Sequence, residues 1–243
     1  MVESRFISAV ALYGPKTGRA RDFLRGVQGL IAENIGDRFV PYSLDQVHCT
    51  LIALNGVPDP RTGVIVNEFY LRQAGARRQM DLGLVMDILA SRFACPLRVR
   101  LGGYRQGQEV PFTSRGQHPF ERAFSVQRDG AFVVIGWPAG PGRPLDQLRR
   151  DMNAAGVLHR YHSGDADVDN DFYLVVGHHA GAPAAALERA TEAVRALMAA
   201  DPVDLDIGLG QVKIVAAGSP TLAPPLYVSG IPADEEILHS LMS

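Results

Sequence analysis

The stretch Val47-His48-Cys49-Thr50-Leu51-Ile52-Ala53-Leu54 decides how this chain can be interpreted. Its apolar residues predict a β-strand, in which successive side chains point to opposite faces. Cys49 and Leu51 would then face a core, whereas His48 and Thr50 would share the other face. An imidazole moves protons near neutral pH, and a hydroxyl can hydrogen-bond a phosphate oxygen. The pair is therefore a candidate for phosphate chemistry, and the alternative is a strand histidine with a purely structural role.

The composition is that of an ordered protein with a full hydrophobic core. The 243 residues are 47% hydrophobic and 21% charged, which suits one large domain or two closely packed lobes. The formal net charge of -2 gives no general attraction to polyanions, so any contact with nucleic acid would be local. Arginine dominates the basic residues, and Lys16 and Lys213 are the only lysines.

We expect a cytoplasmic protein that does not enter a membrane. No segment approaches the ~20 apolar residues of a transmembrane helix, and the first residues do not resemble a signal peptide. The two cysteines, Cys49 and Cys95, do not make a disulfide framework, and Cys49 is expected to be a small buried residue.

Strand and helix patterns alternate along the chain. A hairpin is predicted from residues 124–127 and 131–137, because Arg128-Asp129-Gly130 supplies an Asp-Gly turn. The order predicts an α/β (α+β) fold with two similar halves, in one domain covering residues 1–243 with a crossover near the Pro/Gly-rich stretch 138–144. Further strands are predicted at residues 5–12, 47–54, 97–101, 172–176, 203–217 and 225–228, and helices at 17–34, 64–92, 145–159 and 184–199.

These features together resemble the two-histidine phosphoesterase family, which includes the bacterial RNA 2′,3′-cyclic phosphodiesterases also called 2′-5′ RNA ligases. The likeness covers nearly the whole chain and comprises an opening strand, a long helix, the strand with His48 and Thr50, and closing strands near 212–215 and Leu226-Tyr227-Val228. In that family, two His-x-Thr/Ser motifs from pseudo-symmetric lobes face each other across a central cleft, without metal. One histidine acts as base and the other as acid.

The resemblance implies two pseudo-symmetric lobes of mixed sheets, flanked by helices around a central cleft. It also implies a phosphoesterase that needs no cofactor and acts on a nucleotide or RNA-terminal cyclic phosphate, or on a 2′-5′ phosphodiester. His48 would be the base or acid and Thr50 a phosphate ligand.

The second motif departs from the family pattern. Where it is expected, the sequence has Asp171-Phe172-Tyr173-Leu174, in which Asp171 and Tyr173 would share a face. An aspartate with an ordinary pKa near ~3.9 is a weak acid catalyst at neutral pH. Two functions stay open. One is a hydrolase in which Asp171 carries a proton or orients water while Tyr173 holds a phosphate oxygen; the other is an impaired member that binds a nucleotide or phosphate ligand as a sensor or scaffold.

Three further residues are candidates for substrate binding. Arg98 and Arg100 alternate on one predicted strand face and would line a phosphate-binding surface, or only aid solubility. His162, on a loop expected to be exposed, is the one substitute for the missing histidine. The acidic run 165–171 resembles the start of a calcium loop but lacks that loop's glycine and its last acidic ligand. We therefore predict a solvated acidic turn without metal ligands. The alternative is a looser divalent-metal site, which would make the protein a metal-assisted hydrolase.

Overall fold

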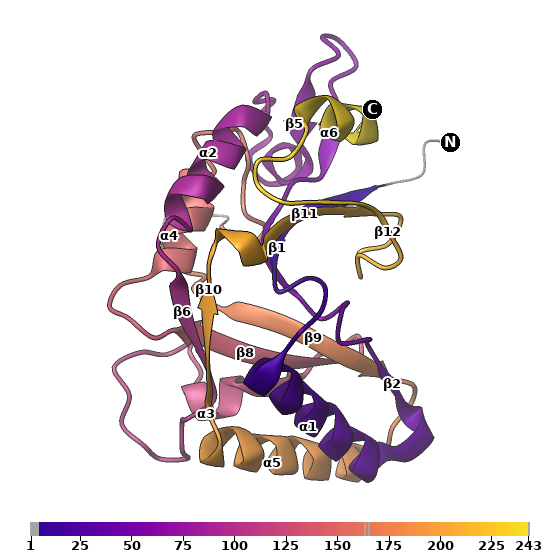
Figure 1. Ribbon diagram of the computed structural model, residues 1–243, viewed down its shortest axis with the longest axis vertical. Coiled ribbons are helices and arrows are strands. Elements are labelled where there is room, and N and C mark those ends of the chain that lie inside the picture. The colour runs from indigo at the N-terminus through magenta and orange to yellow at the C-terminus, as the bar shows by residue number, and fades with distance from the viewer. Residues whose placement is uncertain (1–4, 163, 165, 243) are drawn as a thin grey trace.

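A computed structural model describes residues 5–162, 164 and 166–242. Within these residues the structure is mixed α/β and is built on a ten-stranded antiparallel sheet (Figure 1). The strands follow the order β10 (Val203–Ile207), β6 (Leu97–Leu101), β8 (Ala131–Pro138), β9 (Phe172–His179), β3 (Cys49–Ala53), β1 (Phe6–Ala11), β11 (Val212–Ala217) and β12 (Pro225–Ser229). In addition, β2 (Phe39–Pro41) pairs with β9, β7 (Phe124–Val126) pairs with β8, and β4 (Gly56–Pro58) and β5 (Ile65–Asn67) pair separately.

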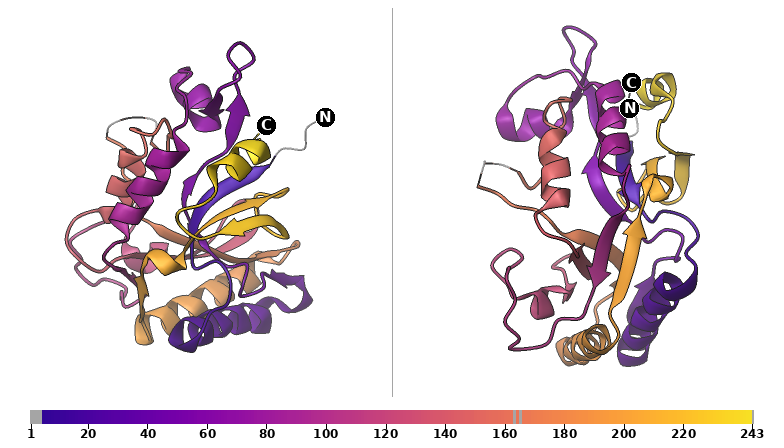
Figure 2. Two further views of the ribbon diagram at one scale, coloured as in Figure 1. Left: turned by 45° about the horizontal axis from the view of Figure 1, so that its top comes forward. Right: turned by 60° about the vertical axis from the view of Figure 1, so that its left-hand side comes forward.

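Two pairs of helices pack around this sheet. Helix α1 (Gly18–Ile35) lies alongside α5 (Ala184–Ala200), and α2 (Leu82–Arg92) lies alongside α4 (Pro144–Asp151) (Figure 2). Shorter elements are α3 (Pro119–Arg122), α6 (Glu235–Met242) and the single turns Gly36–Arg38, Tyr70–Ala74 and Leu209–Gln211. The apolar stripe of α1 is buried, as its helical spacing predicts. Among the described helices, none is both long and apolar enough to cross a membrane.

The predicted hairpin is confirmed. Strands β7 and β8 pair antiparallel, and the Asp129 carboxylate accepts a hydrogen bond from the Ala131 amide at 3.1 Å. Gly130 has a φ of 85°, a conformation that glycine adopts without strain. A Cβ at this position would also lie 3.1 Å from the His179 carbonyl oxygen. The Asp-Gly pair therefore forms the turn by local chemistry, and the nearby His179 carbonyl leaves little room for a side chain at position 130.

The helix predicted over residues 64–92 is wrong in its first half. Residues 65–67 form β5, and a turn over Tyr70–Ala74 ends at Gly75, whose φ is 63°. Helix α2 begins only at Leu82, because the Asp81 carboxylate accepts a hydrogen bond from the Leu84 amide and caps the helix there.

One other predicted element is shorter than expected. The helix predicted over 145–159 ends at Asp151, and the following turns bring Gly156 close to the backbone of Gln79. Gly156 has a φ of 72°, and a Cβ there would lie 2.2 Å from the Gln79 carbonyl oxygen. Strands are present in 203–217 as predicted: β10 and β11, separated by Gly208 and the turn Leu209–Gln211.

One arginine joins β3 to the beginning of β9. The two strands pair at Cys49 and Leu174, and Arg149 of α4, only 2% exposed, lies between them where they diverge. Its guanidinium donates hydrogen bonds to the carbonyls of Thr50 (3.5 Å), Leu51 (3.1 Å), Asp169 (2.7 Å) and Asp171 (3.1 Å). Because buried carbonyls must be paired, this single side chain takes the place of missing sheet hydrogen bonds. We call this arrangement the β3–β9 junction.

Candidate functional site

The predicted alternation of side chains around His48 is confirmed. Cys49 and Leu51 are completely buried, whereas His48 and Thr50 are half-buried on the opposite face. The register of Cys49 with Leu174 makes Tyr173 the cross-strand neighbour of Thr50. We call the surface formed by His48, Thr50 and Tyr173 the His48 face.

The imidazole of His48 is held in one tautomer. Its Nδ1 lies 2.6 Å from the carbonyl oxygen of Gln46, and a carbonyl only accepts, so Nδ1 carries the proton and Nε2 the lone pair. Nε2 has no hydrogen-bond partner in the described part of the chain and is not among its buried unpartnered atoms, so it opens to solvent. Burial lowers the pKa of His48, and the charge of Lys16 lowers it further. A neutral imidazole with an open lone pair can act as a general base.

Two hydroxyl groups accompany this base. Neither Thr50 Oγ1 nor Tyr173 Oη forms a hydrogen bond with another described residue, and neither is buried away from solvent. Burial raises the pKa of Tyr173 to about 12, so its phenol stays protonated and can donate. One base beside two unused hydroxyl donors is an arrangement that can hold the oxygens of an anion and remove a proton next to it.

Tyr13, which the sequence analysis did not single out, flanks the His48 face. Its ring lies 5.6 Å from the imidazole ring of His48, and its hydroxyl donates to the Leu222 carbonyl at 2.7 Å. The tyrosine thereby fixes one side of the imidazole, and no local sequence signal indicated this because Leu222 lies in a distant loop.

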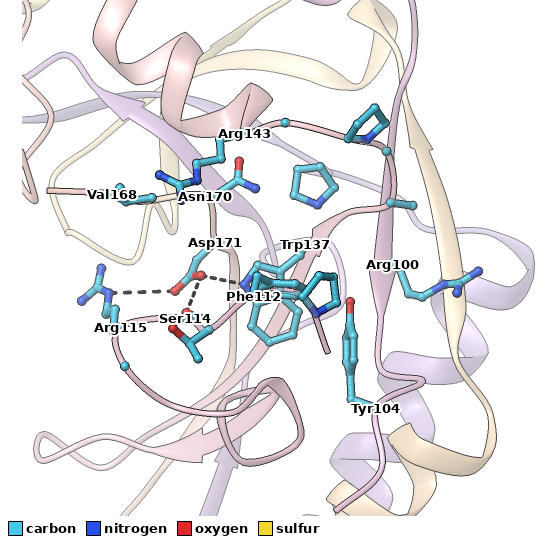
Figure 3. A pocket seen from close by; sticks show the side chains of 18 of the residues that line it. Arg100, Tyr104, Phe112, Ser114, Arg115, Trp137, Arg143, Val168, Asn170 and Asp171 are labelled. Carbon is cyan, nitrogen blue, oxygen red and sulfur yellow. Dashed lines mark hydrogen bonds and ion pairs between the residues drawn. The ribbon is translucent and has the colours of Figure 1, made fainter. Parts of the chain in front are cut away.

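Asp171 has an anchoring role. Its Oδ1 accepts hydrogen bonds from Ser114 Oγ at 2.7 Å and Trp137 Nε1 at 2.8 Å (Figure 3). Its Oδ2 accepts a hydrogen bond from Arg122 at 3.2 Å. Arg115 lies 3.9 Å from Oδ2. Both carboxylate oxygens of Asp171 are therefore already occupied by hydrogen-bond donors, and a role as proton carrier stays a prediction.

A pocket of about 1070 Å³ opens beside Asp171 (Figure 3). Three aromatic rings, Tyr104, Phe112 and Trp137, meet edge to face along its wall, with centroids 5.4–5.9 Å apart. Asp171 lines this pocket, but as far as the described residues go, its lining includes none of the residues of the His48 face. The structure therefore places the two halves of the predicted site in different surroundings along β9.

Arg98 and Arg100 project from one face of β6, as the alternation predicts. Arg98 pairs with Asp206 at 2.9 Å and Arg100 with Asp204 at 2.8 Å, both across the β6–β10 register. Such solvent-exposed pairs contribute little to stability. Arg100 also lines the pocket, whereas Arg98 is absent from its described lining. A role for either arginine in substrate binding stays a prediction.

The expectation that His162 is exposed is wrong. The side chain is buried, with Nε2 lying 3.0 Å from Asp146 Oδ1 and the ring 5.1 Å from that of His159. His159 in turn hydrogen-bonds Asp169 at 2.8 Å. Carboxylates from α4 and from the segment before β9 supply the polar partners that let these histidines enter the interior. His162 therefore belongs to a buried network and not to the His48 face.

The acidic run forms no metal site in the part of it that can be described. Asp165 lies outside the described residues, Asp169 pairs with Arg149 at 3.3 Å and with His159, and Asp171 is held as above. No group of three or more histidine, cysteine or acidic side chains among the described residues is arranged to hold a metal ion.

Comparison with known proteins adds no assignment. The chain matches no protein-family model, and no curated protein is significantly similar to it. Any function must therefore be argued from the geometry of the His48 face and from the motif that it carries.

Proposed function

We propose that the protein is a metal-independent phosphoesterase acting on a nucleotide or RNA-terminal cyclic phosphate, or on a 2′-5′ phosphodiester. The observation that carries this proposal is the open Nε2 lone pair of His48, beside the unused hydroxyls of Thr50 and Tyr173. The resemblance of the His48 strand to the two-histidine phosphoesterases supplies the substrate class. The proposal includes two pseudo-symmetric halves, with β3 and the pair α2/α4 in one half and β9 and the pair α1/α5 in the other.

In the proposed reaction, His48 Nε2 takes a proton from a water molecule as the water oxygen attacks phosphorus. The hydroxyls of Thr50 and Tyr173 donate hydrogen bonds to the non-bridging oxygens, where negative charge develops. The bond from phosphorus to the leaving ribose oxygen breaks, and that oxygen takes a proton from solvent.

The test is hydrolysis of 2′,3′-cyclic nucleotides and 2′-5′ dinucleotides by the wild type and by His48→Ala. His178→Ala is the matched control, because His178 lies near the other end of β9, with its ring 5.3 Å from that of Tyr42. We expect turnover to be lost in His48→Ala and retained in His178→Ala. Turnover that is unchanged in His48→Ala would remove His48 from the mechanism.

A second candidate function is a binding module without turnover. It is favoured by Asp171, which stands where the family has its second histidine and has both oxygens occupied. Calorimetry with a 2′,3′-cyclic nucleotide separates the two functions. Binding without hydrolysis supports a sensor or scaffold, and the absence of both binding and hydrolysis counts against both functions.

A further inference from the structure

Lys16 is a buried cation in a chain that otherwise avoids lysine. Only Lys16 and Lys213 among the 24 basic residues are lysines. Lys16 lies in the loop between β1 and α1 and is 8% exposed. Lysine is almost never buried to this degree unless its ammonium group is paired with an anion.

The ammonium group of Lys16 has unused hydrogen-bond donors. Its Nζ donates to the Gly14 carbonyl at 3.0 Å, which uses one of three N–H groups. In the described part of the chain no carboxylate forms an ion pair with it, and Asp45 acts on it only as a neighbouring charge. Burial lowers the pKa of Lys16 to about 8, so the side chain is still mostly protonated at pH 7. A buried charge without a counter-ion is costly, and a bound anion would offset that cost.

The loop that carries Lys16 adjoins the segment that leads to His48. The Gly14 amide donates to the Asp45 carbonyl at 2.8 Å, which ties the two segments together. The charge of Lys16 also acts directly on His48 and lowers its pKa. Helix α1 begins two residues after Lys16 with no acidic residue in its first turn, so its own side chains there do not neutralise the positive charge.

We propose that Lys16 is the cationic ligand of a phosphate group bound at the His48 face. Its two unused N–H groups would donate to non-bridging oxygens of that phosphate. This proposal rests on the proposed function for its ligand, but it can be measured without turnover. A lysine suits the position because an ammonium is a compact point charge, unlike the broad guanidinium used elsewhere in the chain.

Calorimetric titration with inorganic sulfate tests the proposal. Sulfate resembles phosphate but keeps one charge state between pH 7 and pH 9. The variants are Lys16→Met and Lys16→Arg, with Arg92→Met as the control of equal charge. Arg92 is exposed on α2, where it pairs with Asp151 of α4.

We expect Lys16→Met to weaken sulfate binding by at least roughly tenfold, as removal of a charged hydrogen-bond donor does. Arg92→Met should stay within about twofold of the wild type, since screened surface charges act weakly. In the wild type, affinity should fall as the pH rises from 7 to 9, because Lys16 loses its proton. The other groups near it do not titrate in this range, since the pKa of His48 is lowered and that of Tyr13 is raised. Lys16→Arg should bind sulfate without this pH dependence.

The outcomes separate this inference from the proposed function. Equal sulfate affinity in folded Lys16→Met and wild type would overturn the role of Lys16, even if His48→Ala abolishes turnover. Sulfate binding that depends on Lys16 in a protein without turnover would support the anion ligand and count against the hydrolase. If Lys16→Met does not fold, the pH dependence of Lys16→Arg decides, because a pH dependence equal to that of the wild type would also overturn the proposal.

Discussion

Replacing Arg149 by methionine tests the β3–β9 junction. The change keeps an apolar chain of similar length but removes the donors to four backbone carbonyls and the ion pair with Asp169 at 3.3 Å. Breaking a buried pair by removing one partner costs about 3–5 kcal/mol. For a domain of this size, each kcal/mol lowers Tm by roughly 2–4 °C, so we expect a fall of roughly 6–20 °C.

Thermal unfolding by circular dichroism measures this effect, and Arg98→Met is its control. Arg98 also pairs with an aspartate, but both side chains are more than half exposed, so the control should lose little stability. A Tm for Arg149→Met within about 2 °C of that of Arg98→Met would refute the reasoning, because the four carbonyls would then need no donor from the protein.

Three further outcomes follow from the same contacts. Asp171→Asn should lower the free energy of unfolding by roughly 3 kcal/mol, because Arg122 stays buried without its carboxylate. A loss of activity in a variant of unchanged stability would instead indicate that Asp171 carries a proton. Tyr173→Phe should reduce kcat/KM by roughly tenfold or more without changing the Tm by more than a few degrees, and unchanged kinetics would exclude its hydroxyl as a phosphate ligand. Burial lowers the pKa of His159 to about 4, below the ~6.5 of the unfolded chain. The unfolded state therefore binds the proton first, and stability measured by urea unfolding should fall by roughly 3 kcal/mol as the pH drops from 6.5 to 4; a wild-type profile as flat as that of His159→Gln would contradict this.

The sequence predicted the features that neighbouring residues determine. The hairpin follows from Asp129 and Gly130, the long first helix follows from its apolar spacing, and the half-buried positions of His48 and Thr50 follow from the alternation of a strand. Each of these depends on periods of two or 3.6 residues, or on one turn, all of which can be recognised within a short window.

The sequence could not predict features that depend on long-range contacts. Asp171 accepts hydrogen bonds from Ser114, Trp137 and Arg122, which are 57, 34 and 49 residues away along the chain. The donor from Arg149 to the Leu51 carbonyl spans 98 residues. These partners hold the Asp171 carboxylate in place, and no local sequence pattern indicates them. The near absence of other lysines distinguishes Lys16 in the sequence, although composition alone did not indicate that it would be buried.

The tautomer of His48 depends on a backbone group, and this gives position 46 considerable freedom. The acceptor for Nδ1 is the main-chain carbonyl of residue 46, which every amino acid supplies. Exchanging Gln46 for alanine would therefore leave the proton on the same ring nitrogen. Where a side-chain carboxylate orients a histidine, one mutation can remove the acceptor and change the tautomer. Here the side chain at position 46 can be substituted while the backbone acceptor, and with it the tautomer of the base, stays the same.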